Sequence, residues 1–118
     1  MKYGNRKVTT SDGQVFDSQK EAVRWMELNI LANAGMITNL RRQVKYILIP
    51  AQYMEVKGKK KGKLVERECS YIADFTYNQN GETIVEDVKG YKGGGAYAVF
   101  TIKRKLMLML YGIRVREV

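Results

Sequence analysis

Two strand-like segments joined by a tight turn constrain the fold of this chain most strongly. Residues 71–77 and 83–89 are rich in β-branched and aromatic residues, which favour β-strands. The sequence between them, Asn78-Gln79-Asn80-Gly81, contains the Asn-Gly pair that is typical of a turn between antiparallel strands. The pattern therefore predicts an antiparallel hairpin, and the rest of the chain has to pack around it.

Apolar residues recur at helical spacing in two further segments. Residues 18–34 carry apolar side chains every three or four positions and are followed by Gly35, which predicts a helix that is substantially buried. A second helix is predicted over residues 99–110, because apolar side chains again recur there and a glycine at position 112 ends the pattern. The remaining strands are predicted at residues 42–49, 52–56 and 113–118.

The predicted elements describe one α/β domain. A chain of 118 residues has the size of a single domain with its own core. The expected core is a mixed β-sheet flanked by two helices, in the order α-β-β-β-α-β. Residues 1–13 are polar and basic and contain the turn signal Asp12-Gly13, so we expect an arm or a short hairpin there. Residues 57–63 hold five lysines and two glycines and are predicted to form a mobile, solvated loop.

The charge of the chain indicates a polyanionic partner. The 21 Lys and Arg residues outnumber the 12 Asp and Glu residues, for a formal charge of +9. Such a field attracts nucleic acid, and by the same physics acidic membrane surfaces. A membrane-surface protein is disfavoured because no amphipathic basic helix with an exposed apolar face stands out. The candidate DNA contacts are Lys57, Lys59, Lys60, Lys61, Lys63, Lys103, Arg104, Arg41 and Arg42.

The residue types that are missing limit the chemistry. The chain has no histidine, and Cys69 is its one cysteine. These counts exclude Ser-His and Cys-His nucleophile pairs, His-ligated zinc and thiolate metal clusters. Any catalysis has to use carboxylates, lysines and a hard metal ion. The N-terminus is polar and no segment approaches ~18 consecutive apolar residues, so we expect a cytoplasmic protein.

Three charged residues of the predicted hairpin form the candidate active site. Side chains alternate along a strand, so Asp87 and Lys89 are expected on the same face. Asp74 lies on the partner strand among apolar residues, where an unpaired carboxylate is costly. A divalent cation between Asp74 and Asp87 would compensate that cost. The Lys89 ammonium would then stabilise charge on a scissile phosphate or orient the attacking water.

These motifs resemble those of known nucleases. The sequences Ile72-Ala73-Asp74-Phe75 and Val85-Glu86-Asp87-Val88-Lys89-Gly90 resemble the signature of the PD-(D/E)XK nuclease superfamily, with Ala73 in place of its proline. Glu21 matches a glutamate that this superfamily often carries on its first helix. Over nearly its whole length the chain also resembles a family of small uncharacterised phage-encoded proteins. The arrangement is similar, in addition, to that of phage endonucleases that resolve Holliday junctions and other branched DNA.

The resemblance implies a restriction-endonuclease-like fold and a divalent-metal-dependent endonuclease. It implies Mg²⁺ or Mn²⁺ as cofactor, branched or structured DNA as substrate, and a role in phage replication or recombination in the host cytoplasm. A homodimer is expected from the same resemblance. The implied catalytic residues are Glu21, Asp74, Asp87 and Lys89, and the implied metal ligands are Asp74, Asp87, Glu21 and the backbone carbonyl of Val88.

Each of these assignments has a simpler alternative. Asp74 could be satisfied by backbone amides, and Asp87 with Lys89 could be an ordinary ion pair on one face of a strand. The sequence Ser18-x-x-Glu21 also fits a capping box at a helix start. Glu86 is expected on the opposite face from Asp87, in a structural role. For the whole protein, the alternative is a catalytically inactive DNA-binding module on a nuclease fold.

Overall fold

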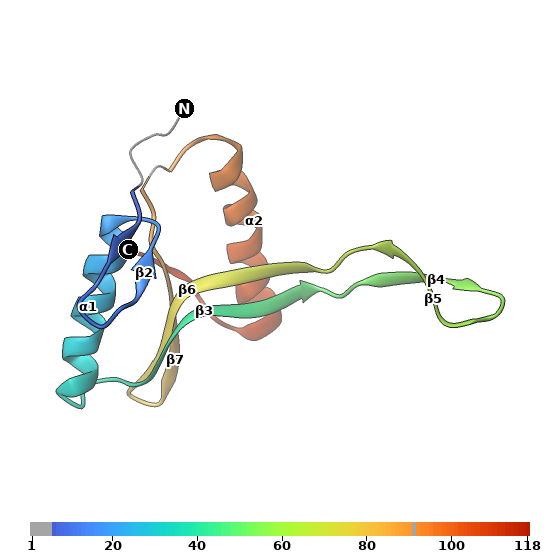
Figure 1. Cartoon of the computed structure of the whole chain (residues 1–118). Coiled ribbons are helices and arrows are strands. Elements are labelled where there is room, and N and C mark those ends of the chain that lie inside the picture. Colours follow the sequence, from blue (N-terminus) through green and yellow to red (C-terminus); the bar gives the residue numbers. More distant parts are fainter. Residues whose placement is uncertain (1–5, 91) are drawn as a thin grey trace.

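The computed structural model describes residues 6–90 and 92–118. Its main sheet has four strands in the order β3-β6-β7-β8, of which β3, β6 and β7 are antiparallel and β8 is parallel to β7. Helices α1 and α2 lie on either side of this sheet (Figure 1). The bounds are β3 Thr38–Ile49, β6 Cys69–Gln79, β7 Glu82–Asp87, β8 Arg116–Glu117, α1 Gln19–Asn33 and α2 Gly94–Tyr111. The prediction of an α/β protein with a mixed sheet and two flanking helices is confirmed.

The hairpin between β6 and β7 forms as predicted. Its turn consists of Asn80 and Gly81, which have positive φ angles of 52° and 79°. Two consecutive residues in this left-handed region match the twist of a two-residue hairpin, and Asn and Gly adopt it at the lowest cost. The register pairs Phe75 with Glu86 and Tyr77 with Ile84, so the local sequence determines which residues of β6 and β7 lie side by side.

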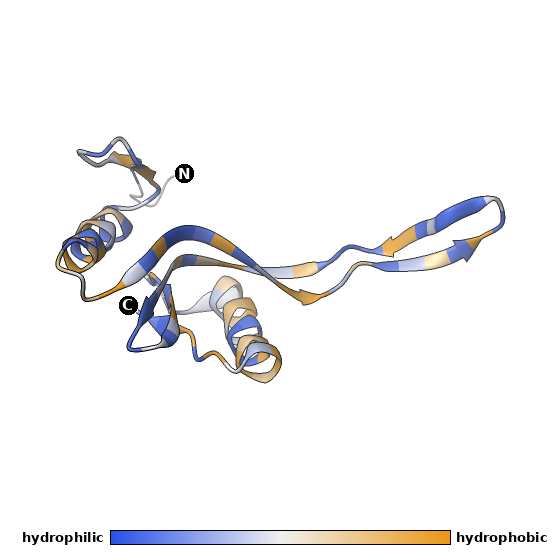
Figure 2. Cartoon of the chain, turned by 90° about the horizontal axis from the view of Figure 1, so that it is seen from below, coloured by the Kyte–Doolittle hydropathy of each residue, from blue (hydrophilic) through white to orange (hydrophobic). Residues whose placement is uncertain are grey.

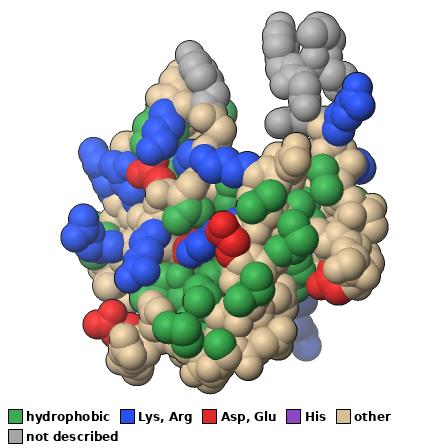
Figure 3. Space-filling model, turned by 90° about the vertical axis from the view of Figure 1, so that its left-hand side faces the viewer, with side chains coloured by type: hydrophobic (Ala, Val, Ile, Leu, Met, Phe, Trp, Pro, Cys, Tyr) green, Lys and Arg blue, Asp and Glu red, His purple; other side chains and the backbone are tan. Residues whose placement is uncertain are grey.

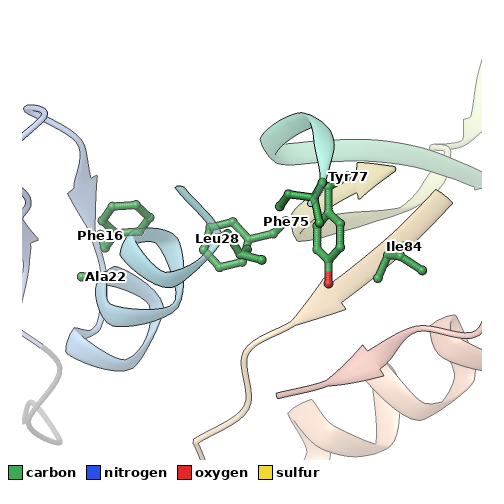
Figure 4. Packing of buried hydrophobic residues seen from close by; sticks show 7 residues of the cluster. Phe16, Ala22, Leu28, Phe75, Tyr77 and Ile84 are labelled. Carbon is green, nitrogen blue, oxygen red and sulfur yellow. The ribbon is translucent and has the colours of Figure 1, made fainter. Parts of the chain in front are cut away.

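The core consists of two clusters on opposite faces of the sheet. Ile84 of β7 belongs to the cluster covered by α1, and its neighbour Val85 belongs to the cluster covered by α2, as the alternation of a strand requires. Figure 4 shows the α1 side, where Leu28 lies beside Phe75. The buried residues are Phe16, Ala22, Leu28, Ile37, Phe75, Tyr77 and Ile84 on the α1 side, and Leu48, Tyr71, Ala73, Val85, Phe100, Met107 and Val115 on the α2 side.

The two helices are less buried than their apolar sequences suggest. In α1 only Ala22 and Leu28 are buried, whereas Val23, Met26 and Ile30 are exposed. Figure 3, viewed from the α1 side, shows hydrophobic side chains at the surface among Lys and Arg residues. The prediction of a substantially buried first helix is therefore wrong, because the small sheet covers only one of its faces. No helix in residues 6–90 and 92–118 is long and apolar enough to cross a membrane.

The N-terminal segment forms a short hairpin in the part that is described. Strand β1 (Val8–Thr9) pairs with β2 (Val15–Phe16) in antiparallel fashion, so the expected hairpin is present. Phe16 enters the core, and its ring lies 6.0 Å from that of Trp25 and 6.3 Å from that of Phe75. Residues 1–5 of the predicted arm lie outside the described residues.

The lysine-rich segment is a strand and not a loop. Strands β4 (Gln52–Val56) and β5 (Lys59–Glu66) form a two-stranded ribbon, and only the turn at Lys57 and Gly58 connects them. The prediction of a mobile loop over residues 57–63 is therefore wrong for Lys59, Lys60, Lys61 and Lys63. Pairing with β4 supplies backbone hydrogen bonds, and exposed lysine side chains do not oppose an extended backbone. This ribbon is inserted between β3 and β6 and extends away from both helices (Figure 1).

Candidate active site

Asp74 and Asp87 meet at the end of the β6–β7 hairpin. Phe75 pairs with Glu86, so the next positions along the two strands, Asp74 and Asp87, lie opposite each other. Their carboxyl groups are close enough for Asp87 to raise the pKa of Asp74. Asp74 Oδ2 also accepts a hydrogen bond of 2.7 Å from the backbone N–H of Val88. The strand pairing therefore brings together the two acids that the sequence singled out.

The electrostatics of the pair favour a proton or a cation between the two acids. Burial, followed by the adjacent Asp87, raises the pKa of Asp74 to about 8, although the hydrogen bond from Val88 acts in the opposite direction. Two neighbouring carboxylates in a poorly hydrated place repel each other, and any group that supplies positive charge relieves that repulsion. Asp87 itself is only 7% exposed.

Lys89 completes the site on the α2 side of the sheet. Its Nζ atom lies 2.8 Å from Asp87 Oδ2 and 3.5 Å from the centre of the Phe100 ring. Asp87, Lys89 and Phe100 line an open pocket of about 370 Å³, and Lys103 of α2 lies at the same pocket. An ammonium held between a carboxylate and an aromatic face is restrained by both. Lys89 is therefore positioned before any ligand binds.

Glu21 lies near the pair but does not complete a three-acid group. Its backbone N–H donates to Ser18 Oγ at 3.1 Å, which is the serine half of the expected capping box. Burial, then Asp17 and to a lesser degree Asp87, raise the pKa of the Glu21 carboxyl. Within residues 6–90 and 92–118, no three Asp, Glu, Cys or His side chains are grouped closely enough to hold one ion. Glu21 is thus placed to act on the pair through its charge.

The residues present fit a divalent cation bound by two carboxylates and water. Mg²⁺ and Mn²⁺ prefer hard oxygen ligands, and Mg²⁺ commonly keeps several waters beside one or two carboxylates. Tyr71 supports a polar ligand at this place, because its buried hydroxyl has no hydrogen-bond partner in the described structure. Burial and the charges of Asp87 and Asp74 raise the pKa of that hydroxyl. A lone buried hydroxyl beside two acids is costly unless a further polar group binds there.

The backbone carbonyl of Val88 points toward the same side of the strand as Asp74. The carbonyl of Asp87 and the N–H of Lys89 bond to Val118 at the β8 side. The peptide groups of successive residues in an extended strand point to opposite sides, so the N–H and carbonyl of Val88 both face β6. The N–H of Val88 donates to Asp74. The role of the Val88 carbonyl as a metal ligand, which the resemblance implies, stays a prediction.

A comparison with known protein families places the sequence. The model of a family described as "Protein of unknown function (DUF1064)" matches residues 1–116. The chain belongs to the DUF1064 family. No curated protein and no solved structure matches the chain.

A buried ion pair beside the site was only half predicted. Glu86 lies on the opposite face from Asp87, as expected, and is 1% exposed. Arg24 of α1 donates to both of its carboxylate oxygens, at 2.8 and 2.6 Å, and the Tyr77 hydroxyl donates at 2.5 Å. The sequence shows an acid on an apolar face, which requires a partner, but it does not identify Arg24. Lys20 of α1 forms a second contact with this segment, because its ammonium donates a hydrogen bond to the Lys89 carbonyl.

The candidate DNA-binding residues lie at several different places in the structure. Lys103 lies at the pocket itself, and Arg41 is exposed on β3. Arg104 pairs with Glu117 at 3.0 Å. Arg42 packs over the Phe16 ring at 3.8 Å and donates to Gln14 at 2.8 Å, so its guanidinium holds the N-terminal hairpin on the core. The five lysines of residues 57–63 lie on the β4–β5 ribbon, away from the pocket.

Proposed function

We propose that this protein is a divalent-metal-dependent endonuclease with a PD-(D/E)XK-like core, which hydrolyses phosphodiester bonds in DNA. The observation that carries the proposal is the meeting of Asp74 and Asp87, with the Lys89 ammonium 2.8 Å from Asp87 at an open pocket. The net charge of +9 supports a polyanionic substrate. The resemblance to junction-resolving phage endonucleases favours branched or structured DNA, and a homodimer, within that class.

Each side chain of the site has a defined part in this reaction. Asp74 and Asp87 would hold Mg²⁺ or Mn²⁺, which when bound supplies Lewis-acid stabilisation and an activated water. Lys89 then places its positive charge beside the scissile phosphate, where negative charge develops in the transition state. Asp87 and Phe100 restrain the Lys89 ammonium, so little reorganisation is needed. Lys103, at the rim of the same pocket, contacts a flanking phosphate.

The decisive experiment is a cleavage panel with and without Mg²⁺ or Mn²⁺. The substrates are linear, single-stranded, flapped and four-way DNA, and Lys89→Met is the test variant. We expect cleavage to require the metal and Lys89→Met to lower kcat about 10²- to 10³-fold, as the removal of one charge-stabilising donor does elsewhere. Lys105→Met, at an exposed position of α2, is the control and should cleave normally. If Lys89→Met cleaves DNA with the kcat of the wild type, Lys89 takes no part in the reaction.

Glu21 is expected to support metal binding from outside the ligand set. We expect Glu21→Gln to weaken the binding of Mn²⁺ about 10- to 100-fold, the usual effect of a group that acts on metal ligands indirectly. Calorimetric titration with Mn²⁺ measures this change. Glu27→Gln, an exposed substitution on the same helix, should leave the affinity unchanged. Equal Mn²⁺ affinity of Glu21→Gln and the wild type would restrict the role of Glu21 to the helix start.

The second candidate function is a DNA-binding module without catalysis. The observation in its favour is that two acids, and not three, come together within the described residues. Millimolar Mn²⁺ distinguishes the two functions, because the nuclease has to bind the ion at the Asp74–Asp87 pair. Tight DNA binding without calorimetric heat from Mn²⁺, and without cleavage of any substrate, would favour the binding module.

A further inference from the structure

The β4–β5 ribbon stands apart from the core. Among the strands of the described residues, β4 and β5 pair only with each other, and Figures 1 and 2 show the ribbon extending away from both helices. The radius of gyration is 17.5 Å and the longest dimension is 56 Å, whereas a compact chain of this length has a radius of gyration of about 13 Å. The projecting ribbon accounts for this difference, so it is a feature on the scale of the whole molecule.

The core provides no structural reason for the ribbon. Every residue of β4 and β5 is exposed except Val56 and Gly62, which are half-buried. An isolated two-stranded ribbon is marginally stable in water. Its shape is nonetheless specific: Gly62 has a φ of 73°, and a side chain there would meet the Met54 carbonyl at 2.4 Å. A shaped, exposed element that belongs to neither core cluster of the described residues is suited to contact a partner.

The side chains of the ribbon indicate which partner. Lys57, Lys59, Lys60 and Lys61 lie at its outer end, and Lys63 is paired with Met54. None of these five lysines forms an ion pair in the part of the chain that the structure describes. Tyr53, Met54, Leu64 and Val65 lie nearer the core and are exposed, and Figure 2 shows the hydrophilic tip and the apolar segments behind it. A second copy of the chain would bring one lysine cluster against another. Duplex DNA fits better, because a two-stranded ribbon fits its major groove and lysines neutralise its phosphates.

The length of the ribbon determines where that contact falls. The chain from Lys60 to Asp74 is almost entirely extended, so at about 3.3 Å per residue it spans on the order of 40 Å. At about 3.4 Å per base pair, this reach corresponds to roughly 12 base pairs. We propose that the β4–β5 ribbon binds duplex DNA about one helical turn away from the bond that is cleaved at the Asp74–Asp87 pair. The inference rests on the proposed function for the position of the cleaved bond.

The test measures binding to DNA duplexes of increasing length, in EDTA so that no strand is cut. Fluorescence anisotropy with duplexes of about 8, 12, 16 and 24 base pairs should show affinity rising steeply up to about one helical turn and then levelling off. In the triple variant Lys59→Gln, Lys60→Gln, Lys61→Gln we expect this rise to disappear. Affinity for the longest duplex should fall tenfold or more, and the slope of log affinity against log salt should fall by up to about 3, at roughly 0.9 per phosphate contact.

A matched control removes the same charge elsewhere. The triple variant Arg6→Gln, Lys105→Gln, Arg114→Gln changes three exposed residues outside the ribbon and should keep the length dependence. A ribbon variant that binds every length as the wild type does, or that alters only the self-association of the protein in sedimentation, overturns the inference. Cleavage assays with metal separate the two proposals. If the wild type cuts no DNA but the ribbon variant loses the length dependence of binding, only the nuclease proposal is overturned. Normal cleavage with unchanged length dependence overturns only the ribbon contact.

Discussion

Replacing Asp74 with asparagine should abolish cleavage and, at the same time, make the metal-free protein more stable. Removal of a metal ligand costs several kcal/mol of transition-state stabilisation, so we expect kcat to fall at least about a thousandfold. The stability should rise because asparagine carries no charge beside Asp87, yet its carbonyl oxygen can still accept the Val88 N–H.

The pH dependence of unfolding shows why Asp74→Asn should raise the stability of the metal-free protein. The pKa of Asp74 is about 8 in the folded protein, against an ordinary value of 3.8. Between these values the folded protein binds a proton that the unfolded chain has lost, so the free energy of unfolding of the wild type falls as pH rises from about 4 to 8. In Asp74→Asn the free energy of unfolding should not fall in this way, because the titrating carboxyl is absent. At pH 8.5 in EDTA we expect a gain on the order of 2 kcal/mol, because the carboxyl is only partly buried and solvent screens it.

Thermal and urea unfolding in EDTA and in Mg²⁺ measure both parts. Millimolar Mg²⁺ should raise the Tm of the wild type, because a ligand of the folded state stabilises it, and should leave Asp74→Asn unchanged. Glu82→Gln removes an exposed acid at the start of β7 and serves as the control. An Asp74→Asn protein that is less stable than the wild type at pH 8.5 in EDTA would contradict the expectation that the Asp74 and Asp87 carboxylates repel each other in the folded protein.

Breaking the buried pair between Arg24 and Glu86 should produce the largest loss of stability. In Arg24→Met the Glu86 carboxylate, 1% exposed, loses the two hydrogen bonds from the guanidinium and keeps only the Tyr77 hydroxyl. A buried charge that loses its partner typically costs 3–5 kcal/mol, so we expect a loss of about that size. Urea denaturation at neutral pH measures it, with an unchanged dependence on urea concentration as the sign of two-state unfolding.

Two further variants show whether the loss comes from the unpaired charge. The double variant Arg24→Met, Glu86→Leu removes both charges and should recover most of the stability. Glu27→Gln removes only the exposed partner of Arg24, 3.1 Å away, and should cost less than about 1 kcal/mol. A cost below about 1 kcal/mol for Arg24→Met itself would mean that Glu86 finds another partner. The pair holds α1, and with it Glu21, against the strand that carries Asp87.

Several parts of the fold can be predicted from short stretches of sequence, because they depend on neighbouring residues. Asn80 and Gly81 adopt the backbone angles of a two-residue hairpin turn, which an Asn-Gly pair favours between strands. Strand alternation separated Asp87 and Lys89 from Glu86, and the structure shows the ion pair on one face and the Arg24 contact on the other. Ser18 caps the first helix and Gly112 ends the second with a φ of 69°. Each of these features is decided within a few residues of chain.

Other features depend on partners that are distant along the chain, and these could not be predicted. Lys59, Lys60, Lys61 and Lys63 lie in a strand because β4 pairs with that segment, and no local pattern in a lysine-rich segment signals that pairing. Arg24 lies 62 positions from Glu86, and the exposure of Ile30 depends on which face of α1 the sheet happens to cover. Local backbone preferences act along the chain, whereas burial and ion pairing act between segments that only folding brings together. The candidate site needed both, since alternation oriented Asp87 and Lys89 and the pairing of β6 with β7 brought Asp74 to them.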